Sequence, residues 1–175
     1  LDYVLGRRPD EFGLIPDPDG FVKIKELLKA INEEEGWGWV RQAALNEVTI
    51  TLPEPPVEIV GGRVRAANRK NLPIRTPAMD MPTLLYTCVR RKAHPVVVKH
   101  GVSPLGGGDS VVLAADEAMA ERLGRRFDAA PVKLTVNTDQ CINAGLIMEQ
   151  YGEGLFLVEE LPPHCFTAPP LPKER

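Results

Sequence analysis

The sequence is poor in the residues that cross-link small secreted proteins or hold structural metals. Its only cysteines are Cys88, Cys141 and Cys165. They are odd in number, far apart and without C-x-x-C spacing, which excludes a disulfide framework and gives no zinc motif. The three histidines, His94, His100 and His164, also lack metal-ligand spacing. We therefore expect no metal site and expect the cysteines to be free thiols.

Long apolar segments are missing as well. No apolar run approaches the ~20 residues that a helix needs to cross a bilayer. The first residues, Leu1-Asp2-Tyr3-Val4, lack the basic region followed by an apolar core that marks a secretory leader. We expect a cytoplasmic protein with no membrane partner.

The chain also lacks a positive net charge. Its formal charge of -3 argues against a protein that holds nucleic acid by bulk electrostatics, because that mode needs many Lys and Arg residues on one face. Local cationic sites remain possible. Three runs are candidates: Arg63 to Lys70, Arg90-Arg91-Lys92, and Arg122 with Arg125-Arg126.

What is present is an ordinary globular composition, with 43% hydrophobic and 26% charged residues in a chain of 175. Ile24, Leu27, Leu28 and Ile31 fall at helical spacing and predict one amphipathic helix that stops by Gly36. A second apolar stretch covers residues 39–48, with Trp37 and Trp39 expected in the core, and residues 49–52 are typical of a strand.

The second half alternates short β-like and helical segments, which predicts an α+β or α/β lobe. Asp116 has the side chain and position to cap a helix that Gly124 ends. Prolines at 53, 55 and 56 mark a candidate lobe boundary, and the proline-rich residues 166–175 are expected to form an extended tail.

Around Gly61-Gly62 the sequence gathers cations beside a predicted tight hairpin. Side chains alternate along a strand, so Arg63, Arg65 and Arg69 are predicted to share a face. Such a strand is either a solvated cationic face or an anion site.

Several collinear blocks resemble the RNA 2'-phosphotransferase (KptA-like) family. The opening from Tyr3 to Leu14 resembles Y-V-L-R-H-x-P-E-E-x-G-L, and Asp19-Gly20-Phe21-Val22 resembles D-G-[WY]-V. Residues 58–71 resemble F-E-I followed by I-R-A-N-Q-G-H-S, and residues 82–89 resemble P-x-x-L-Y-H-G-T. Residues 101–113 resemble G-L-x-P-M-G-R-x-x-V-H-L. The ordered set is far more specific than any one block.

The resemblance implies a winged-helix lobe over residues 1–72, an ADP-ribosyltransferase-like lobe over 73–165, and a tail. It also implies that NAD and an RNA 2'-phosphate meet between the lobes. In the family reaction the 2'-phosphate attacks the nicotinamide ribose of NAD and expels nicotinamide. A ribose hydroxyl then attacks that phosphate and leaves a free RNA 2'-OH. The family uses three arginines and one histidine to hold the phosphate, as charge stabilisation requires.

This sequence departs from that tetrad. The paired Arg-His falls on Gly6 and Arg7, the second arginine on Arg65, and the third in Gly106-Gly107-Gly108. Because a guanidinium does not give up its proton near neutrality, Arg7 can hold a phosphate but cannot replace histidine as an acid or base.

The resemblance nevertheless assigns candidate sites. Arg65 and Arg7 are the candidate catalytic residues, and the same two with Arg69 and Lys70 are the candidate phosphate and RNA ligands. The NAD-contacting block falls on Tyr86, Thr87 and Cys88, although Cys88 also reads as a packed thiol. The triglycine could cradle a phosphate, but neither a Lys-Ser/Thr pair nor a helix start follows it.

Three functions remain open at this stage. The first is a family member with weak or absent transferase activity that still binds a nucleotide or an RNA end near Arg65. The second is an active NAD-dependent phosphotransferase with Arg7, Arg69 or Lys70 as substitute cations. The third is a non-enzymatic interaction module that uses the first lobe and the tail.

Overall fold

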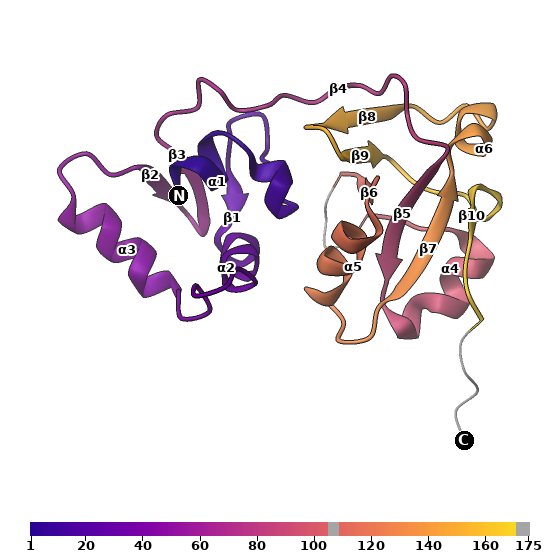
Figure 1. The fold of residues 1–175 in the computed structure, drawn as a ribbon, viewed down its shortest axis with the longest axis horizontal. Helices are drawn as coiled ribbons and strands as arrows, with labels where there is room; N and C mark the ends of the chain where they lie inside the picture. The colour runs from indigo at the N-terminus through magenta and orange to yellow at the C-terminus, as the bar shows by residue number, and fades with distance from the viewer. Residues whose placement is uncertain (105–108, 171–175) are drawn as a thin grey trace. The chain divides into compact units, whose positions relative to one another are not determined.

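The computed structural model describes residues 1–104 and 109–170, and it divides into two compact units, Leu1–Ile74 and Arg75–Arg175. Each unit combines helices with its own antiparallel sheet, so the α+β prediction is confirmed (Figure 1). The proline run at residues 53–56 lies inside the first unit, just before a strand, and the division comes later in the chain.

The first unit packs helices against a three-stranded sheet of order β1-β3-β2. Its core contains Leu5, Leu27, Leu45 and Val64, which are almost completely buried. The elements in chain order are α1 (Asp2–Gly6), a short 3-10 helix (Pro9–Phe12), β1 (Val22–Lys23), α2 (Ile24–Asn32), α3 (Gln42–Thr51), β2 (Val57–Val60) and β3 (Arg63–Ala66).

Two predictions about this unit are confirmed. Helix α2 buries Ile24, Leu27 and Ile31 along one stripe. The β2–β3 hairpin turns through Gly61 and Gly62, whose φ angles of 54° and 79° are both left-handed. A two-residue turn with both φ angles positive matches the twist of the strands that it joins, and glycine adopts that conformation without a side-chain penalty.

Two other predictions are wrong. Residues 49–51 continue helix α3 instead of forming a strand. The hydroxyls of Thr49 and Thr51 donate to the helix carbonyls of Asn46 and Glu47 at 2.7 Å, so the helix satisfies both polar groups. Trp37 and Trp39 are not core residues, since 54% and 66% of their surfaces are exposed. Their rings stack on each other, with centroids 6.3 Å apart.

The second unit is built on an antiparallel sheet of seven described strands in the order β10-β7-β5-β6-β9-β8-β4. The strands are β4 (Thr76–Pro77), β5 (Leu84–Val89), β6 (Val111–Ala114), β7 (Val132–Asn137), β8 (Met148–Tyr151), β9 (Leu155–Val158) and β10 (Phe166–Thr167). The helices are α4 (His94–His100), α5 (Glu117–Arg125) and α6 (Thr138–Asn143), with short 3-10 helices at Arg91–Ala93 and Pro163–Cys165. The sheet thus extends into the segment that the sequence assigned to the tail.

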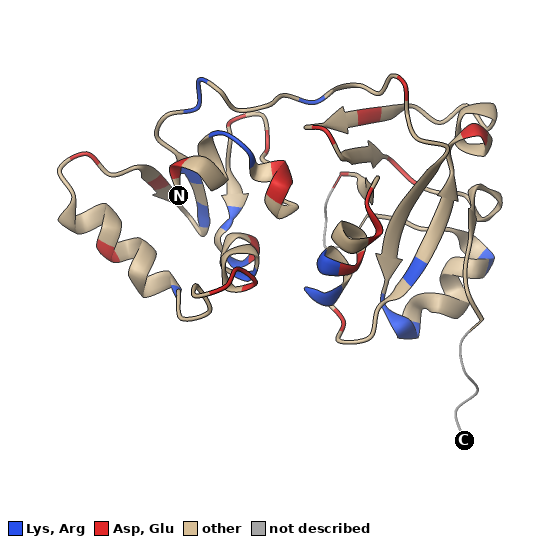
Figure 2. Ribbon diagram, in the orientation of Figure 1, with Lys and Arg blue, Asp and Glu red and all other residues tan. Residues whose placement is uncertain are grey.

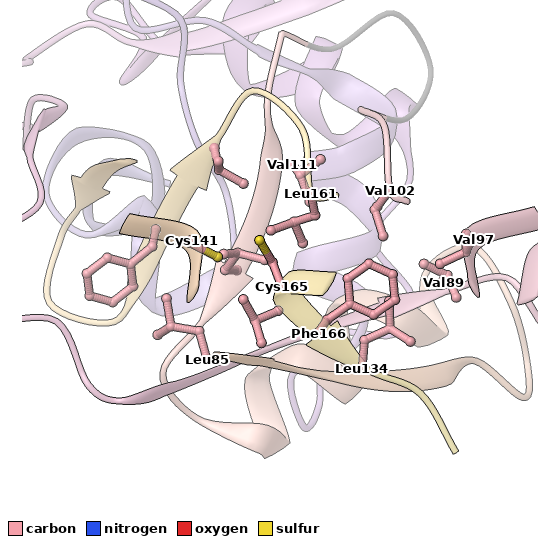
Figure 3. Packing of buried hydrophobic residues seen from close by; sticks show 14 of the residues in the cluster. Leu85, Val89, Val97, Val102, Val111, Leu134, Cys141, Leu161, Cys165 and Phe166 are labelled. Carbon is pink, nitrogen blue, oxygen red and sulfur yellow. The ribbon is translucent and has the colours of Figure 1, made fainter. Parts of the chain in front are cut away.

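The central strands of this sheet have two different faces. Leu85 and Val89 of β5 lie in register with Val136 and Val132 of β7, and these side chains join the buried core. Figure 3 shows that core, in which Val97 of α4, Cys141 of α6 and Cys165 also lie. On the opposite face the sheet carries Tyr86 and Cys88, with α5 packed against it.

Helix α5 begins as predicted, because the Asp116 carboxylate accepts a hydrogen bond of 2.9 Å from the Ala118 N–H. It does not end at Gly124, which lies inside the helix. A Cβ at that position would come within 2.6 Å of Cys88 Cβ and 2.9 Å of Pro131 Cβ. The glycine therefore permits close packing of α5 on β5 and does not terminate the helix.

Candidate functional site

Arg65 lies on β3 with its guanidinium held on three sides. Its Nε and Nη2 groups both reach Glu58 Oε2, at 2.9 and 2.8 Å, and Nη1 donates to the Asp19 carbonyl at 3.2 Å. The guanidinium carbon lies 4.5 Å above the centre of the Phe21 ring. These contacts combine an ion pair, a neutral hydrogen bond and a cation–π contact.

The hairpin register explains this arrangement. Glu58 of β2 is the direct cross-strand partner of Arg65, and Arg65 shares its face of β3 with Arg63. The opposite face of β3 buries Val64 and Ala66. The guanidinium of Arg65 is therefore not unpaired, because the Glu58 carboxylate already accepts from two of its N–H groups.

A loop over residues 17–20 borders the same face. Asp17 Oδ1 accepts hydrogen bonds from the N–H groups of Asp19 and Phe21, and its Oδ2 pairs with Arg63 at 3.3 Å. This turn chemistry aims the Asp19 carbonyl and the Phe21 ring at β3. Arg63 and Arg65 are thus each satisfied by a residue of this loop.

Arg69 reaches this loop from another direction. Strand β3 ends at Ala66, so the alternation of side chains along this strand does not extend to Arg69. The prediction that Arg69 shares a strand face with Arg63 and Arg65 is therefore wrong. Its Nη1 donates to the Ala66 carbonyl at 2.6 Å, and its Cδ lies 2.6 Å from where a Cβ of Gly20 would stand. Lys70, by contrast, is exposed.

Gly6 fills the position where the family motif has its first arginine, and it is buried at the end of α1. A Cβ there would stand 2.6 Å from the Asn68 carbonyl oxygen and 3.2 Å from Ala66 Cβ. Any side chain at position 6 would force the backbone of residues 66–68 to move. Arg7 follows Gly6 and is exposed at the end of the helix. Its partnership with Arg65 stays a prediction.

In the second unit, Thr87 and Cys88 direct their side chains into the protein. Thr87 is buried, and its hydroxyl donates to the Val112 carbonyl at 3.0 Å. Cys88 lies beneath α5, and burial raises the pKa of its thiol to about 11. A thiol with this pKa is a packing group rather than a nucleophile. The side chains of Thr87 and Cys88 therefore do not fit a direct contact with a nucleotide.

Tyr86 is only partly buried and joins a polar cluster beside α5. Lys133 Nζ lies 2.8 Å from Glu117 and 3.4 Å from Glu121. The pKa of Glu117 lies below its usual value because Lys133 and, to a smaller extent, the Tyr86 hydroxyl bind its carboxylate. Among the three residues matched to the NAD motif, Tyr86 is the one with an accessible side chain.

The remaining assignments are limited by the described ranges. The expected third arginine position, in Gly106-Gly107-Gly108, lies outside the described residues. No cluster of three or more His, Cys, Asp or Glu suited to a metal ion occurs in residues 1–104 and 109–170. Over the same residues, every helix is too short or too polar to span a bilayer.

Sequence reasoning missed the direct partners of Arg65. Glu58 could have been found, because a hairpin turning at Gly61-Gly62 places residue 60 opposite 63 and therefore 58 opposite 65. Phe21 and Asp19 carried no such signal, since their approach depends on the pairing of β1 with β3.

Comparison with known proteins finds relatives that align with nearly the whole chain. No family model matches it. A protein of Thermococcus kodakarensis named "Probable RNA 2'-phosphotransferase" is 29% identical over 95% of this chain and 92% of its own length. A protein of the same name from Acetivibrio thermocellus is 29% identical over 91% and 88%, and one from Pyrococcus horikoshii is 27% identical over 95% and 94%. The chain is thus similar, along nearly its whole length, to proteins named as probable RNA 2'-phosphotransferases.

Proposed function

We propose that this protein binds RNA carrying a 2'-phosphate through Arg65 and that it transfers this phosphate to the ADP-ribose moiety of NAD, with release of nicotinamide, slowly or not at all. In this proposal the first unit is the winged-helix, RNA-binding lobe and the second is the ADP-ribosyltransferase-like lobe. The packing at Gly6 carries the argument, because the backbone of Asn68 occupies the space that an arginine side chain would need to enter.

Charge stabilisation supports the same conclusion. The phosphate is the nucleophile in the first displacement and is attacked by a hydroxyl in the second, so it needs cations around it in both. Each missing cationic side chain typically costs ~100-fold or more in rate. Arg65 is neutralised by Glu58, and Arg69 is engaged by a backbone carbonyl. Such a site can still exchange a carboxylate for a phosphate, which is sufficient for binding.

The packing of the second unit supports the part of the proposal that concerns slow reaction with NAD. Two of the three side chains matched to the NAD motif, Thr87 and Cys88, are buried and engaged within the sheet and under α5. Recognition of a nucleotide by those side chains would require them to leave their packing positions. We therefore assign no chemical step to them.

Release of nicotinamide tests the proposal directly. Purified protein is mixed with excess NAD and a short RNA with one internal 2'-phosphate, and the Thermococcus kodakarensis relative serves as comparator. We expect binding of the RNA with nicotinamide release far below one equivalent over the time in which the comparator completes a turnover. Stoichiometric release would instead establish the active enzyme with Arg7, Arg69 or Lys70 as substitute cations.

Absence of binding would have a different meaning. If the 2'-phosphorylated RNA and its 2'-OH match bind equally or not at all, the Arg65 site is not a phosphate site. The interaction-module hypothesis would then lead. The exposed stack of Trp37 and Trp39 is the kind of surface that such a module uses, since tryptophan is enriched at protein interfaces.

A further inference from the structure

Both tryptophans of the chain lie in one short exposed segment of the first unit. Trp37 and Trp39 belong to the connection between α2 and α3, and more than half of the surface of each residue is exposed. Their rings are stacked, with an interplanar angle of 21°. Tryptophan is highly buried on average in folded proteins, so two neighbouring exposed indoles point to a surface that meets a ligand. We call the pair Trp37 and Trp39 the tryptophan platform.

The segment that carries the platform is fixed at both ends. The Trp37 N–H donates to the Glu34 carbonyl at 3.1 Å, and the N–H of the buried Val40 donates to the Trp37 carbonyl at 3.3 Å. Arg41 Nη1 donates to the carbonyls of Gly38 and Val40 at 2.8 and 2.9 Å. The indoles are therefore held before a ligand arrives, and less conformational freedom is lost on binding.

Glycines on either side leave space beside the rings. A Cβ at Gly36 would meet no atom within 4 Å, and a Cβ at Gly38 would have its nearest neighbour at 3.9 Å. Gly36 also has a left-handed φ angle of 82°, which favours glycine at this turn. Packing does not require a glycine at position 38, but the missing side chains keep the surroundings of the indoles open.

The same part of the surface offers little to a phosphate group. Figure 2 shows helix α3 almost entirely in tan, and its one charged residue is Glu47. Arg41 is the single Lys or Arg in residues 36–52, and its guanidinium already donates to two carbonyls. The residues before the platform, Glu33-Glu34-Glu35, are acidic. A nucleic acid bound here would therefore be held by its bases and not by its backbone.

We propose that the tryptophan platform stacks with the bases of single-stranded RNA, as a second contact surface in the unit that carries Arg65. This inference rests on the proposed function for its choice of RNA as the partner. Every base has a flat π-face that stacks on an indole, and single-stranded RNA exposes those faces. The platform adds affinity for any unpaired segment, whereas Arg65 recognises the 2'-phosphate.

Intrinsic fluorescence gives a direct readout, because Trp37 and Trp39 are the chain's two tryptophans. The probes are two RNAs of about 12 nucleotides, identical except for one internal 2'-phosphate, and a ribose–phosphate chain of the same length without bases. We expect both RNAs to quench the tryptophan fluorescence and the base-free chain to leave it unchanged. A duplex of the same sequence should also leave it unchanged, since its bases are already stacked and paired.

The variant Trp39→Leu keeps an apolar side chain and removes the flat ring. By anisotropy of labelled RNA, it should weaken both RNAs by roughly five- to thirtyfold. Trp39→Phe, which keeps a ring, should retain most of the affinity. The control Ile50→Ala removes an apolar side chain that is 81% exposed in the same unit, and it should change RNA binding little. Thermal melting checks that each protein is folded.

Salt dependence separates stacking from an indirect loss of charge contacts. Trp39→Leu removes no phosphate contact, so it should leave the slope of log affinity against log salt unchanged. It should also leave any residual affinity for the base-free chain unchanged. Equal effects of Trp39→Leu and Ile50→Ala would overturn the proposal, as would equal weakening of the RNAs and the base-free chain. Quenching by a proline-rich peptide and by neither RNA would overturn it in favour of a protein-binding surface.

Failure of this proposal is distinguishable from failure of the proposed function. Arg65→Ala should remove the difference in affinity between the two RNAs and leave quenching by the bound RNA nearly unchanged. If the two RNAs quench but never differ in affinity, the Arg65 site is wrong and the platform stands. If they differ in affinity while neither quenches and Trp39→Leu binds like Ile50→Ala, only the platform is wrong. If neither RNA binds, both are wrong.

Discussion

Replacing Glu58 by glutamine tests whether Arg65 can bind a phosphate when the Glu58 carboxylate no longer competes for it. In the folded protein two N–H groups of Arg65 converge on one oxygen of Glu58, at 2.9 and 2.8 Å. A phosphate that binds Arg65 must displace this carboxylate or sit beside it. Glutamine keeps the shape of the side chain and removes the negative charge, so it removes the competitor without removing the cation.

The magnitude follows from the exposure of the pair. The side chains of Arg65 and Glu58 are 25% and 49% exposed, so the pair lies at the protein surface, where water screens the interaction, and the value in water is its lower limit. At 4 Å in water, unit charges interact by about 1 kcal/mol, and a phosphate dianion carries two of them. We expect Glu58→Gln to tighten binding of the 2'-phosphorylated RNA by about ten- to thirtyfold. The cost in stability should be at most about 1 kcal/mol, as for other exposed ion pairs.

Fluorescence anisotropy with the two matched RNAs is the assay, and Glu54→Gln is the control because it removes the same charge from an exposed position in the same unit. Tightening specific to Glu58→Gln and to the 2'-phosphorylated RNA supports the reasoning. If Glu58→Gln weakens this RNA, or tightens both RNAs as much as Glu54→Gln does, the Arg65 site is a structural ion pair and not a phosphate site.

Three further predictions concern a tightly packed glycine, a buried thiol and a helix cap. Gly6→Ala should lower the free energy of unfolding in urea by about 1–3 kcal/mol because of the contact with Asn68, whereas Gly38→Ala, whose Cβ would have a nearest neighbour at 3.9 Å, should cost much less. Cys88 should resist alkylation at about pH 8 until the protein unfolds, because a pKa of about 11 leaves about one thiol in a thousand ionised, and rapid labelling of the native protein would contradict its burial. Asp116→Ala should cost about 1 kcal/mol by loss of the α5 cap, and Asp116→Asn should restore most of it; equal losses for both would assign the effect to charge instead.

The predictions that succeeded rest on local signals. The stripe of α2, the hairpin at Gly61-Gly62 and the cap at Asp116 each follow from a few neighbouring residues. The family resemblance rests on the order of several such blocks, and the relatives bear it out over nearly the whole chain.

The failures have non-local causes. Thr49 and Thr51 look like strand residues, but their hydroxyls find carbonyl partners once a helix has formed. Gly124 looks like a helix end, yet its role is set by Cys88 and Pro131 from other elements. No sequence spacing brings Arg90 near Phe127, because that approach is made by the packing of α5 on β5.

The same contrast between local and non-local causes bears on the proposed loss of catalysis. A missing arginine in an open site could be restored by one exchange, but Gly6 is enclosed by Ala66 and Asn68. Gly6→Arg should therefore destabilise the first unit instead of rescuing transfer. Arg65 differs, because its family-like side chain is retained and its charge is countered by the reversible contact with Glu58. Under the proposed function, phosphate binding should thus be recoverable by a single exchange at position 58, whereas catalysis should not be recoverable by a single exchange at position 6.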